Sequence, residues 1–448
     1  MLKQAAKIGL CAVALVLSGS LFAAEAQFHR FSLTASDGKD RPYIVYTPAG
    51  VAADEKRPLL VYLHGAVSSP DIPAEPLDKV RRSSFLKLAD AGRYLVLFPF
   101  GQKGAAWFDS VGTDMVFKQI NEVEKQFAVD ADKVFMSGFS DGASGTLYLA
   151  ATHPERFAGF IALNGSLPVA AHLGESPVYP ENINHKPLYM INTQGDMLYP
   201  AAMMRPVVDF LRQRHSRLAF QEPEGNHNMA YLEQVLPELR QFVEQNSRHI
   251  TESLVWESSV APSGTDWLRI VRLAPDKAAK PWHGKNSLKM FNGKASFGMK
   301  FDPAYKNGLK VAETTAKGTA AKMGVQPGDI ILKMGDTVMN HAYAPYRYLA
   351  GKKAGDETEL TVARQGRELV LKGRFNPGYQ YEVFEKQPVS GKIRATLQGG
   401  KLVVETSRIA AFSIDFDRLP NRGGDMTLVV DGKAGRVVAK GVQTFEVP

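Results

Sequence analysis

Cysteine is almost absent from this chain of 448 residues, which contains only Cys11. That cysteine lies in an uncharged apolar run, Ile8–Ala24, which follows two lysines. The run is short for a membrane span and ends in small residues, so we expect an export signal, residues 1–26, cleaved near Ala26. A transmembrane anchor is the alternative, and lipid attachment at Cys11 is not expected because Leu10 precedes it. The cleaved chain would be periplasmic or secreted, without disulfides, cysteine metal ligands or a cysteine nucleophile.

Long blocks of one charge are also missing. The formal net charge is +8, but the 54 basic and 46 acidic residues are interleaved along the chain. Such interleaving is typical of a solvated surface rather than of a nucleic-acid interface. After signal cleavage we expect no integral membrane segment, and the length predicts two or three domains.

The first half of the chain alternates between short apolar runs and segments of helical periodicity. After an antiparallel opening around the turn at Ser36–Lys39, this alternation predicts a mostly parallel sheet with helices on both faces. The ligand site of such a sheet lies beyond the carboxyl ends of its strands. The expected strands are 28–34, 41–46, 58–63, 94–98, 134–136, 157–162, 187–191 and 217–221, and the expected helices are 80–91, 114–127, 141–152, 204–214 and 230–245.

One of these apolar runs ends in Gly138-Phe-Ser140-Asp-Gly142. Gly-x-Ser-x-Gly between a strand and a helix is typical of a sharp turn that exposes a nucleophilic serine. Ser140 is therefore the candidate nucleophile, and a simple helix cap is the alternative. Acyl transfer also needs N–H donors for the oxyanion, and we expect these at the backbone amides of Ala66 and Asp141. The His64-Gly65 pair before Ala66 is equally compatible with an ordinary turn.

Two further residues complete a candidate catalytic set. Asp196 follows the strand 187–191, and His227 follows the strand 217–221. Each has an ordinary explanation, Asp196 as a helix cap and His227 as a surface histidine. Together with Ser140, however, they occur in the order Ser, Asp, His at successive strand ends, which is the α/β-hydrolase order. The three side chains predict an acyl-enzyme mechanism that needs no metal or organic cofactor.

Further motifs carry a family resemblance over roughly 28–248. Leu-Val-Leu-Phe-Pro-Phe-Gly with Trp107, the segments 127–134 and 153–158, and Gly-Phe-Ser-Asp-Gly-Ala resemble the secreted esterase branch of the α/β hydrolases, which includes polyhydroxybutyrate depolymerases and feruloyl esterases. The resemblance implies a serine hydrolase that acts on small or polymeric esters. It assigns nucleophile, acid and base to Ser140, Asp196 and His227. The segment Leu167–Lys186 is expected to be a lid-side loop.

The second half of the chain loses helical periodicity. Strand-like runs near Trp256 and at 267–273 are separated by Pro262 and neighbouring turn residues, and more β-rich sequence begins near Gly391. Each group is small for a sheet of its own. We therefore expect one β-rich domain, split between 249–293 and 377–448, in which 267–273 pairs with the C-terminal strands. Those strands are expected at 392–397, 402–406, 409–414, 426–430 and 436–439.

The segment between the two β-rich parts contains Ala320-Ala-Lys-Met-Gly-Val-Gln-Pro-Gly-Asp-Ile-Ile-Leu332. This pattern resembles a bacterial PDZ domain, which we place at 294–376, after a hydrolase domain at 27–248. The resemblance implies that a protein C-terminus binds as an added strand, with its carboxylate on the backbone amides of Phe297, Gly298 and Met299 and beside a helix that starts near Tyr343. A PDZ fold that serves only as a spacer is the alternative.

The leading interpretation is thus an exported serine esterase with a PDZ module for peptide or protein docking. One alternative keeps the catalytic set but makes it a serine peptidase of the prolyl-oligopeptidase-like type. Another is a non-catalytic, PDZ-containing binding protein.

Overall fold

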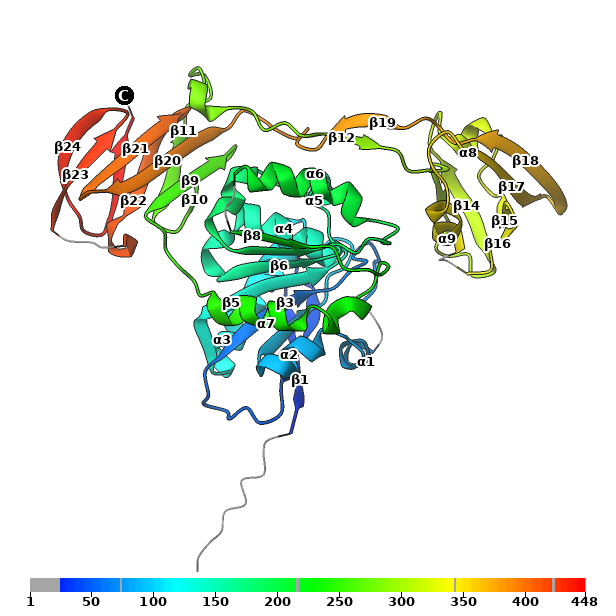
Figure 1. Ribbon diagram of the computed structural model, residues 1–448, viewed down its shortest axis with the longest axis horizontal. Helices are drawn as coiled ribbons and strands as arrows, with labels where there is room; N and C mark the ends of the chain where they lie inside the picture. Colours follow the sequence, from blue (N-terminus) through cyan, green and yellow to red (C-terminus); the bar gives the residue numbers. More distant parts are fainter. Residues whose placement is uncertain (1–24, 73–74, 215–216, 342–343, 421–423, 448) are drawn as a thin grey trace, which may run out of the picture.

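The structure is a computed structural model that describes residues 25–447 except 73–74, 215–216, 342–343 and 421–423 (Figure 1). The expected export signal up to Ala24, including Cys11, lies outside the described residues, and so does Tyr343. Among the described helices, none is long and apolar enough to cross a membrane.

An eight-stranded sheet forms the centre of the first domain. Its order is β1-β2-β4-β3-β5-β6-β7-β8; β1, β2 and β4 pair antiparallel, and the strands from β4 through β3 to β8 pair in parallel. The predicted mostly parallel sheet with an antiparallel opening is confirmed. The strands are β1 (Gln27–Thr34), β2 (Asp40–Thr47), β3 (Arg57–Leu63), β4 (Leu95–Pro99), β5 (Val129–Phe139), β6 (Gly159–Leu163), β7 (Leu188–Ile191) and β8 (Leu218–Gln221).

Helices cover both faces of this sheet. Because side chains alternate along a strand, Leu59, Val61 and Leu63 of β3 enter one core, whereas Leu60 and Tyr62 enter the other. The first core packs against α3 (Ser110–Gln126), α4 (Asp141–Thr152), α5 (Leu167–Leu173) and α6 (Ala201–Arg212), and the second against α1 (Pro76–Arg81), α2 (Leu86–Gly92) and α7 (Leu236–Gln245).

Two predicted helices are each broken in two. The segment 80–91 forms α1 and α2, because the Ser83 hydroxyl accepts a hydrogen bond from the Phe85 N–H and closes a local turn. The segment 230–245 forms a 3₁₀ turn, η3 (Ala230–Glu233), and then α7, in which Pro237 occupies the first turn. Hydrophobic periodicity continued through both breaks and could not reveal them.

The prediction of a lid-side loop at Leu167–Lys186 is wrong. The segment folds as α5 and a 3₁₀ helix, η2 (Pro180–His185), and none of its described side chains lines the pocket beside Ser140 that is described below. It faces the C-terminal β domain instead, where Glu181 forms an ion pair with Lys392. A short 3₁₀ turn, η1 (Pro154–Arg156), precedes it in the chain.

The β domain is built from both parts of the second half. β11 pairs antiparallel with β22, and β9 pairs with β20, which are the pairings that a split domain requires. Two sheets, β10-β11-β22-β25 and β24-β23-β21-β20-β9, enclose one core that contains Trp256 and Trp267. The strands are β9 (Ser253–Ser258), β10 (Ser263–Thr265), β11 (Leu268–Leu273), β20 (Gly391–Gln398), β21 (Lys401–Ser407), β22 (Ile409–Asp415), β23 (Asp425–Val430), β24 (Lys433–Val438) and β25 (Val442–Glu446), with 3₁₀ turns η4 (Pro281–His283) and η5 (Phe416–Arg418).

A two-stranded ribbon leads from the β domain to a third domain. In Figure 1 the antiparallel ribbon of β12 (Lys289–Asn292) and β19 (Tyr379–Glu382) runs above α6 toward the right. Met290, Val383 and Phe384 pack into the hydrolase-side core, with the Phe384 ring 5.3 Å from Phe210 of α6. The third domain contains β13 (Met299–Phe301), β14 (Leu309–Thr314), β15 (Ile330–Met334), β16 (Thr337–Val338), β17 (Glu357–Arg364), β18 (Arg367–Arg374), α8 (Thr319–Lys322) and α9 (Ala344–Ala350).

The interface between η2 and β9 makes a testable prediction. The buried Asn182 amide donates to the Glu257 and Ala151 carbonyls at 2.9 and 3.2 Å and accepts from the Glu257 N–H at 2.9 Å. Asn182→Ala leaves these groups without partners, so we expect the free energy of unfolding to fall by about 3 kcal/mol, measured by urea denaturation. The exposed Asn307→Ala is the control, and equal midpoints for the two variants would contradict the role of Asn182.

Candidate active site

Ser140 lies in a strained turn between β5 and α4. Its φ is 57° and its ψ is −120°, a conformation that non-glycine residues adopt only when their surroundings enforce it. A Cβ on Gly142 would lie 1.9 Å from the Leu63 carbonyl oxygen, and one on Gly138 would lie 2.3 Å from the Gly142 carbonyl oxygen. The two glycines therefore allow the end of β3 and the start of α4 to approach closely enough to hold the serine in this conformation.

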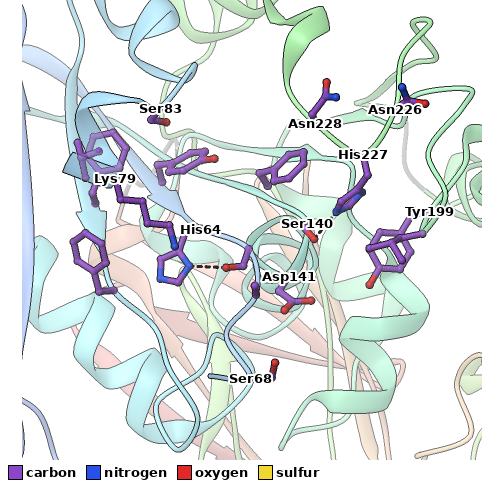
Figure 2. Close-up of a pocket in the computed structure, with 18 of the residues that line it drawn as sticks. His64, Ser68, Lys79, Ser83, Ser140, Asp141, Tyr199, Asn226, His227 and Asn228 are labelled. Atoms are coloured by element: carbon purple, nitrogen blue, oxygen red, sulfur yellow. Dashed lines mark hydrogen bonds between the residues drawn. The ribbon is translucent and has the colours of Figure 1, made fainter. Parts of the chain in front are cut away.

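The structure brings together the three residues that the sequence analysis selected. His227 Nε2 lies 2.8 Å from Ser140 Oγ, and His227 Nδ1 lies 2.8 Å from Asp196 Oδ2. Asp196 follows β7 and His227 follows β8, so both reach Ser140 from neighbouring strand ends. Figure 2 shows Ser140 and His227 pointing toward each other inside the pocket. The arrangement can pass a proton from the hydroxyl to the imidazole while a carboxylate faces the opposite ring nitrogen.

The Asp196 carboxylate is buried but well supplied with donors. Its Oδ1 accepts from the backbone N–H groups of Leu198 and Tyr199 at 2.7 and 2.9 Å. Burial acts to raise the pKa of Asp196, but the hydrogen bonds from His227, Tyr199 and Asn164 outweigh it, and the net pKa lies below the usual value. The carboxylate therefore stays ionised opposite His227.

Asn164 is a site residue that the sequence analysis missed. Its amide nitrogen donates to Asp196 Oδ2 at 2.7 Å and to Thr193 Oγ1 at 2.9 Å, while its oxygen accepts from the Tyr231 hydroxyl at 2.7 Å. Its φ of 53° is a left-handed conformation that asparagine tolerates better than most residues. Asn164 follows β6, so the strand-end rule that identified Asp196 and His227 could have found it.

The candidate oxyanion donors lie next to Ser140, one in the loop after β3 and one at the start of α4. A Cβ on Gly65 would lie 2.9 Å from Ser140 Cβ and 3.4 Å from Ser140 Oγ, so the loop that carries Ala66 runs directly beside the serine. The Asp141 N–H is in the first turn of α4, where no preceding turn supplies an acceptor. The Asp141 carboxylate also accepts from the Val67 N–H at 3.2 Å, which ties the loop to the helix.

His64 ties the loop that carries Ala66 to the segment after β4. Its Nε2 accepts a hydrogen bond from the Gly101 N–H at 3.1 Å, so the proton of the neutral ring is on Nδ1, which donates to the Gly65 carbonyl at 2.7 Å. Burial, aided by the charge of Lys79, lowers the pKa of His64 to about 4. His64 is therefore a neutral structural group at neutral pH.

A cavity of about 860 Å³ opens around Ser140. In Figure 2, Lys79 and His64 lie on one side of Ser140, and Tyr199 lies on the other. Burial lowers the pKa of Lys79 and raises that of Tyr199. Aromatic and aliphatic side chains make up much of the wall: Tyr62, Val80, Phe98, Phe100, Phe139, Met197, Leu198, Tyr199 and Tyr346.

The predicted carboxylate loop lies in a second cavity, of about 870 Å³, in the third domain. Gly298 has a φ of 67°, and its N–H donates to Ser296 Oγ at 3.2 Å, so one of the three predicted donor amides is occupied by a side-chain hydroxyl. Phe297 is buried against Phe375, with ring centroids 4.8 Å apart. Phe297, Gly298 and Met299 all line the cavity.

Removing the Asn164 amide tests its role as a positioning residue. Asn164→Ala should lower kcat/KM for ester hydrolysis about 10-fold, because Asp196 and His227 lose a fixed orientation. Loss of a hydrogen bond to the charged carboxylate should raise the pKa of Asp196 and move the acid limb of the pH–rate profile to higher pH. Thermal unfolding checks the fold, and Tyr231→Phe, which keeps the packing, should have a smaller effect. An unchanged pH profile in Asn164→Ala would show that Asn164 does not position Asp196.

Comparison with known proteins assigns two parts of the chain to families. Residues 50–247 match the Phospholipase/Carboxylesterase family, and residues 295–372 match the PDZ domain family. The chain is 28% identical over 144 residues to a bifunctional acetylxylan esterase/xylanase, XynS20E, of Neocallimastix patriciarum, and 32% identical over 143 residues to the proposed esterase NocK of Nocardia uniformis subsp. tsuyamanensis. The matched parts are 32% and 29% of this chain and only 20% and 40% of these relatives.

Solved structures that resemble the first half include a Staphylococcus aureus fluorophosphonate-binding serine hydrolase, FphF, with a TM-score of 0.41 and 16% identity over 49% of this chain and 99% of that one. An S-formylglutathione hydrolase from Agrobacterium tumefaciens has a TM-score of 0.39 and 15% identity over 50% of this chain and 96% of that one. By sheet order and family match, residues 50–247 belong to the phospholipase/carboxylesterase type of α/β hydrolase, and residues 295–372 are a PDZ domain.

Proposed function

We propose that the hydrolase domain cleaves carboxylic esters with Ser140 as nucleophile, His227 as general base and Asp196 as the group that orients it. The observation that carries this proposal is the continuous contact from Asp196 through His227 to Ser140, with 2.8 Å at each step, at the wall of an 860 Å³ cavity. The strained backbone of Ser140 supports it, because such strain is concentrated at functional turns.

In the proposed reaction His227 Nε2 takes the proton of Ser140 as Oγ bonds to the acyl carbon. The negative charge that develops on the carbonyl oxygen is stabilised by the N–H groups of Ala66 and Asp141. His227 then gives its proton to the departing alcohol oxygen as the ester bond breaks, leaving an acyl-enzyme. Water then bonds to the acyl carbon as the same histidine takes one of its protons, and His227 returns that proton to Ser140 Oγ as the acyl–Oγ bond breaks and the acid leaves. Throughout, the Asp196 carboxylate accepts from His227 Nδ1–H and fixes the tautomer.

The substrate class follows from the wall of the cavity. Tyr62, Phe98 and Phe100 offer an apolar surface for one half of an ester, which can belong to a small molecule or to a polymer end. The names of XynS20E and NocK describe ester-cleaving proteins and support ester chemistry over peptide cleavage. Lys79 lies on the same side of Ser140 as His64 and supplies a cation there.

Replacing the nucleophile tests this proposal directly. Ser140→Ala should lower hydrolysis of a p-nitrophenyl ester by at least about 10³-fold while the far-UV spectrum and melting temperature stay those of the unmodified protein. A fluorophosphonate probe should label the unmodified protein and the exposed-site control Ser247→Ala, but not Ser140→Ala. Casein cleavage without ester cleavage would favour a serine peptidase, and an unchanged ester rate in Ser140→Ala would eliminate Ser140 as the nucleophile.

We also propose that the PDZ domain docks a protein carboxyl terminus. In the described part of its sheet β13 pairs only with β14, so its other edge is available for an added strand. Apolar side chains of Phe297, Met299 and Leu349 line the adjoining cavity.

A labelled peptide with an apolar carboxyl terminus should bind saturably in fluorescence polarisation, and its carboxyl-terminal amide should bind at least about 10-fold more weakly, because it lacks the charge that the backbone N–H groups would hold. Equal affinities, or no saturation, would favour a spacer domain.

A further inference from the structure

The catalytic cavity and the PDZ groove are neighbours that share two residues. Ala66, on the loop beside Ser140, and Tyr346, on α9 of the PDZ domain, line both. The next residues on the α9 face, Pro345 and Leu349, line only the groove. A PDZ residue thus forms part of the wall around the proposed nucleophile, and a hydrolase residue forms part of the wall of the peptide groove.

Several contacts hold the PDZ domain against the catalytic loop. Lys294, just before the carboxylate loop, donates to the backbone carbonyls of Leu198 and Met197, next to Asp196. Burial lowers the pKa of Lys294, against the opposing charge of Asp196. Its ammonium group also lies 6.0 Å from the centre of the Tyr199 ring, which packs edge-on against His227.

The β12–β19 ribbon attaches the PDZ domain to the hydrolase domain at a second place. Phe384 packs on Phe210 of α6, and the Lys386 ammonium donates to the carbonyls of His172 and Gly174 at the end of α5. Because the ribbon enters and leaves the PDZ domain as a pair of hydrogen-bonded strands, both ends of that domain are fixed near the hydrolase surface. The PDZ domain, which carries Tyr346, is therefore attached to the hydrolase domain at two places, through Lys294 and through the ribbon.

The catalytic cavity extends to both sides of Ser140. His64 and Lys79 lie on one side, and Tyr199 lies on the other (Figure 2). Tyr346 lines the same cavity and is near enough to Tyr199 to help raise its pKa. An ester bound at Ser140 must place one half on each side of the scissile bond. The half on the Tyr199 side approaches Tyr346, which also lines the PDZ groove.

The residues of the groove indicate the chemistry of the ester half that approaches Tyr346. In the described part of the sheet β13 pairs only with β14, which leaves its outer edge for a peptide backbone. Phe297 and Met299 flank Gly298, whose N–H already donates to Ser296 Oγ, and we expect their N–H groups to meet a carboxylate. Met299, Phe301, Met334 and Met339 supply an apolar floor. These features together fit an extended peptide that ends in an apolar residue with a free carboxylate.

We propose that the catalytic cavity and the PDZ groove form one bipartite substrate site, whose substrate is an ester with a peptide half that ends in a free carboxyl terminus. Tyr346 is the specificity-determining residue at the junction: it contacts the peptide half as it passes from the groove to Ser140. The proposal rests on the proposed function of Ser140. It extends that function from esters in general to acylated peptide ends.

Matched substrates test the proposal on the full-length protein. The probes are short peptides that carry an O-butyryl-serine at increasing distance from an apolar carboxyl terminus, each made with a free carboxylate and with a terminal amide. At the best spacing we expect kcat/KM to be at least about 10-fold higher for the carboxylate, because charge-assisted hydrogen bonds to the loop are lost in the amide. The ester-free peptide should compete with this substrate.

p-Nitrophenyl butyrate, which is too small to reach the groove, separates the two proposals. Failure of the protein to hydrolyse it would overturn the function of Ser140. Normal hydrolysis of it, with equal rates for carboxylate and amide peptides at every spacing, would overturn the bipartite site alone. An ester-free peptide that accelerates p-nitrophenyl butyrate hydrolysis without competing with the peptide ester would make the groove regulatory and would also overturn it.

Two variants test whether the preference for a free carboxylate arises in the groove. Leu349→Asp places a negative charge in the apolar groove, which repels the peptide carboxylate, and should bring the carboxylate-to-amide ratio close to one. Tyr346→Ala should raise KM for the peptide ester with little change in kcat, since Tyr346 contacts the peptide half and not the reacting atoms. Val370→Ala, exposed on β18 at the far edge of the sheet, is the control and should keep the ratio. A ratio that survives in Leu349→Asp would contradict the assignment of the groove.

Discussion

The close packing of the β5–α4 turn against the end of β3 is the constraint on which the site depends. Gly142 lies so near the Leu63 carbonyl that no side chain fits between them, and a Cβ on Gly65 would lie 2.9 Å from Ser140 Cβ. This contact enforces the positive φ of Ser140 and sets the Ala66 loop beside its hydroxyl. The candidate nucleophile and the candidate oxyanion donors thus come from the ends of two strands that glycine packing holds together.

Around this turn, four successive strand ends supply one polar network. β5 leads to Ser140, β6 to Asn164, β7 to Asp196 and β8 to His227. Asn164 links Asp196 to Tyr231 and Thr193, so the carboxylate is fixed by donors on several elements and stays ionised despite its burial. Parallel pairing makes this convergence possible, because it places the carboxyl ends of these strands at the same edge of the sheet.

The second half of the chain places the PDZ domain beside this edge. The β domain is anchored to η2 through Asn182, and the ribbon that grows from it packs on α6 before it reaches the PDZ domain. This explains why the segment 167–186 is not a lid: its polar side chains are used at the domain interface. The wall expected from that segment comes instead from the loop after β7 and from α9 of the PDZ domain.

The sequence alone determined the parallel sheet, the turn at Ser140 and the candidates Asp196 and His227, because these depend on local periodicity, glycine spacing and chain order. It indicated the PDZ domain through the resemblance of the segment around Ala320–Leu332 to a known family. It did not reveal the break between α1 and α2, the role of Asn164 or the contact of Tyr346 with the catalytic cavity. Those features depend on a side-chain hydrogen bond or on packing between segments far apart in the chain. Ala66 and Tyr346 are 280 positions apart, and only the folded ribbon brings their side chains to one wall.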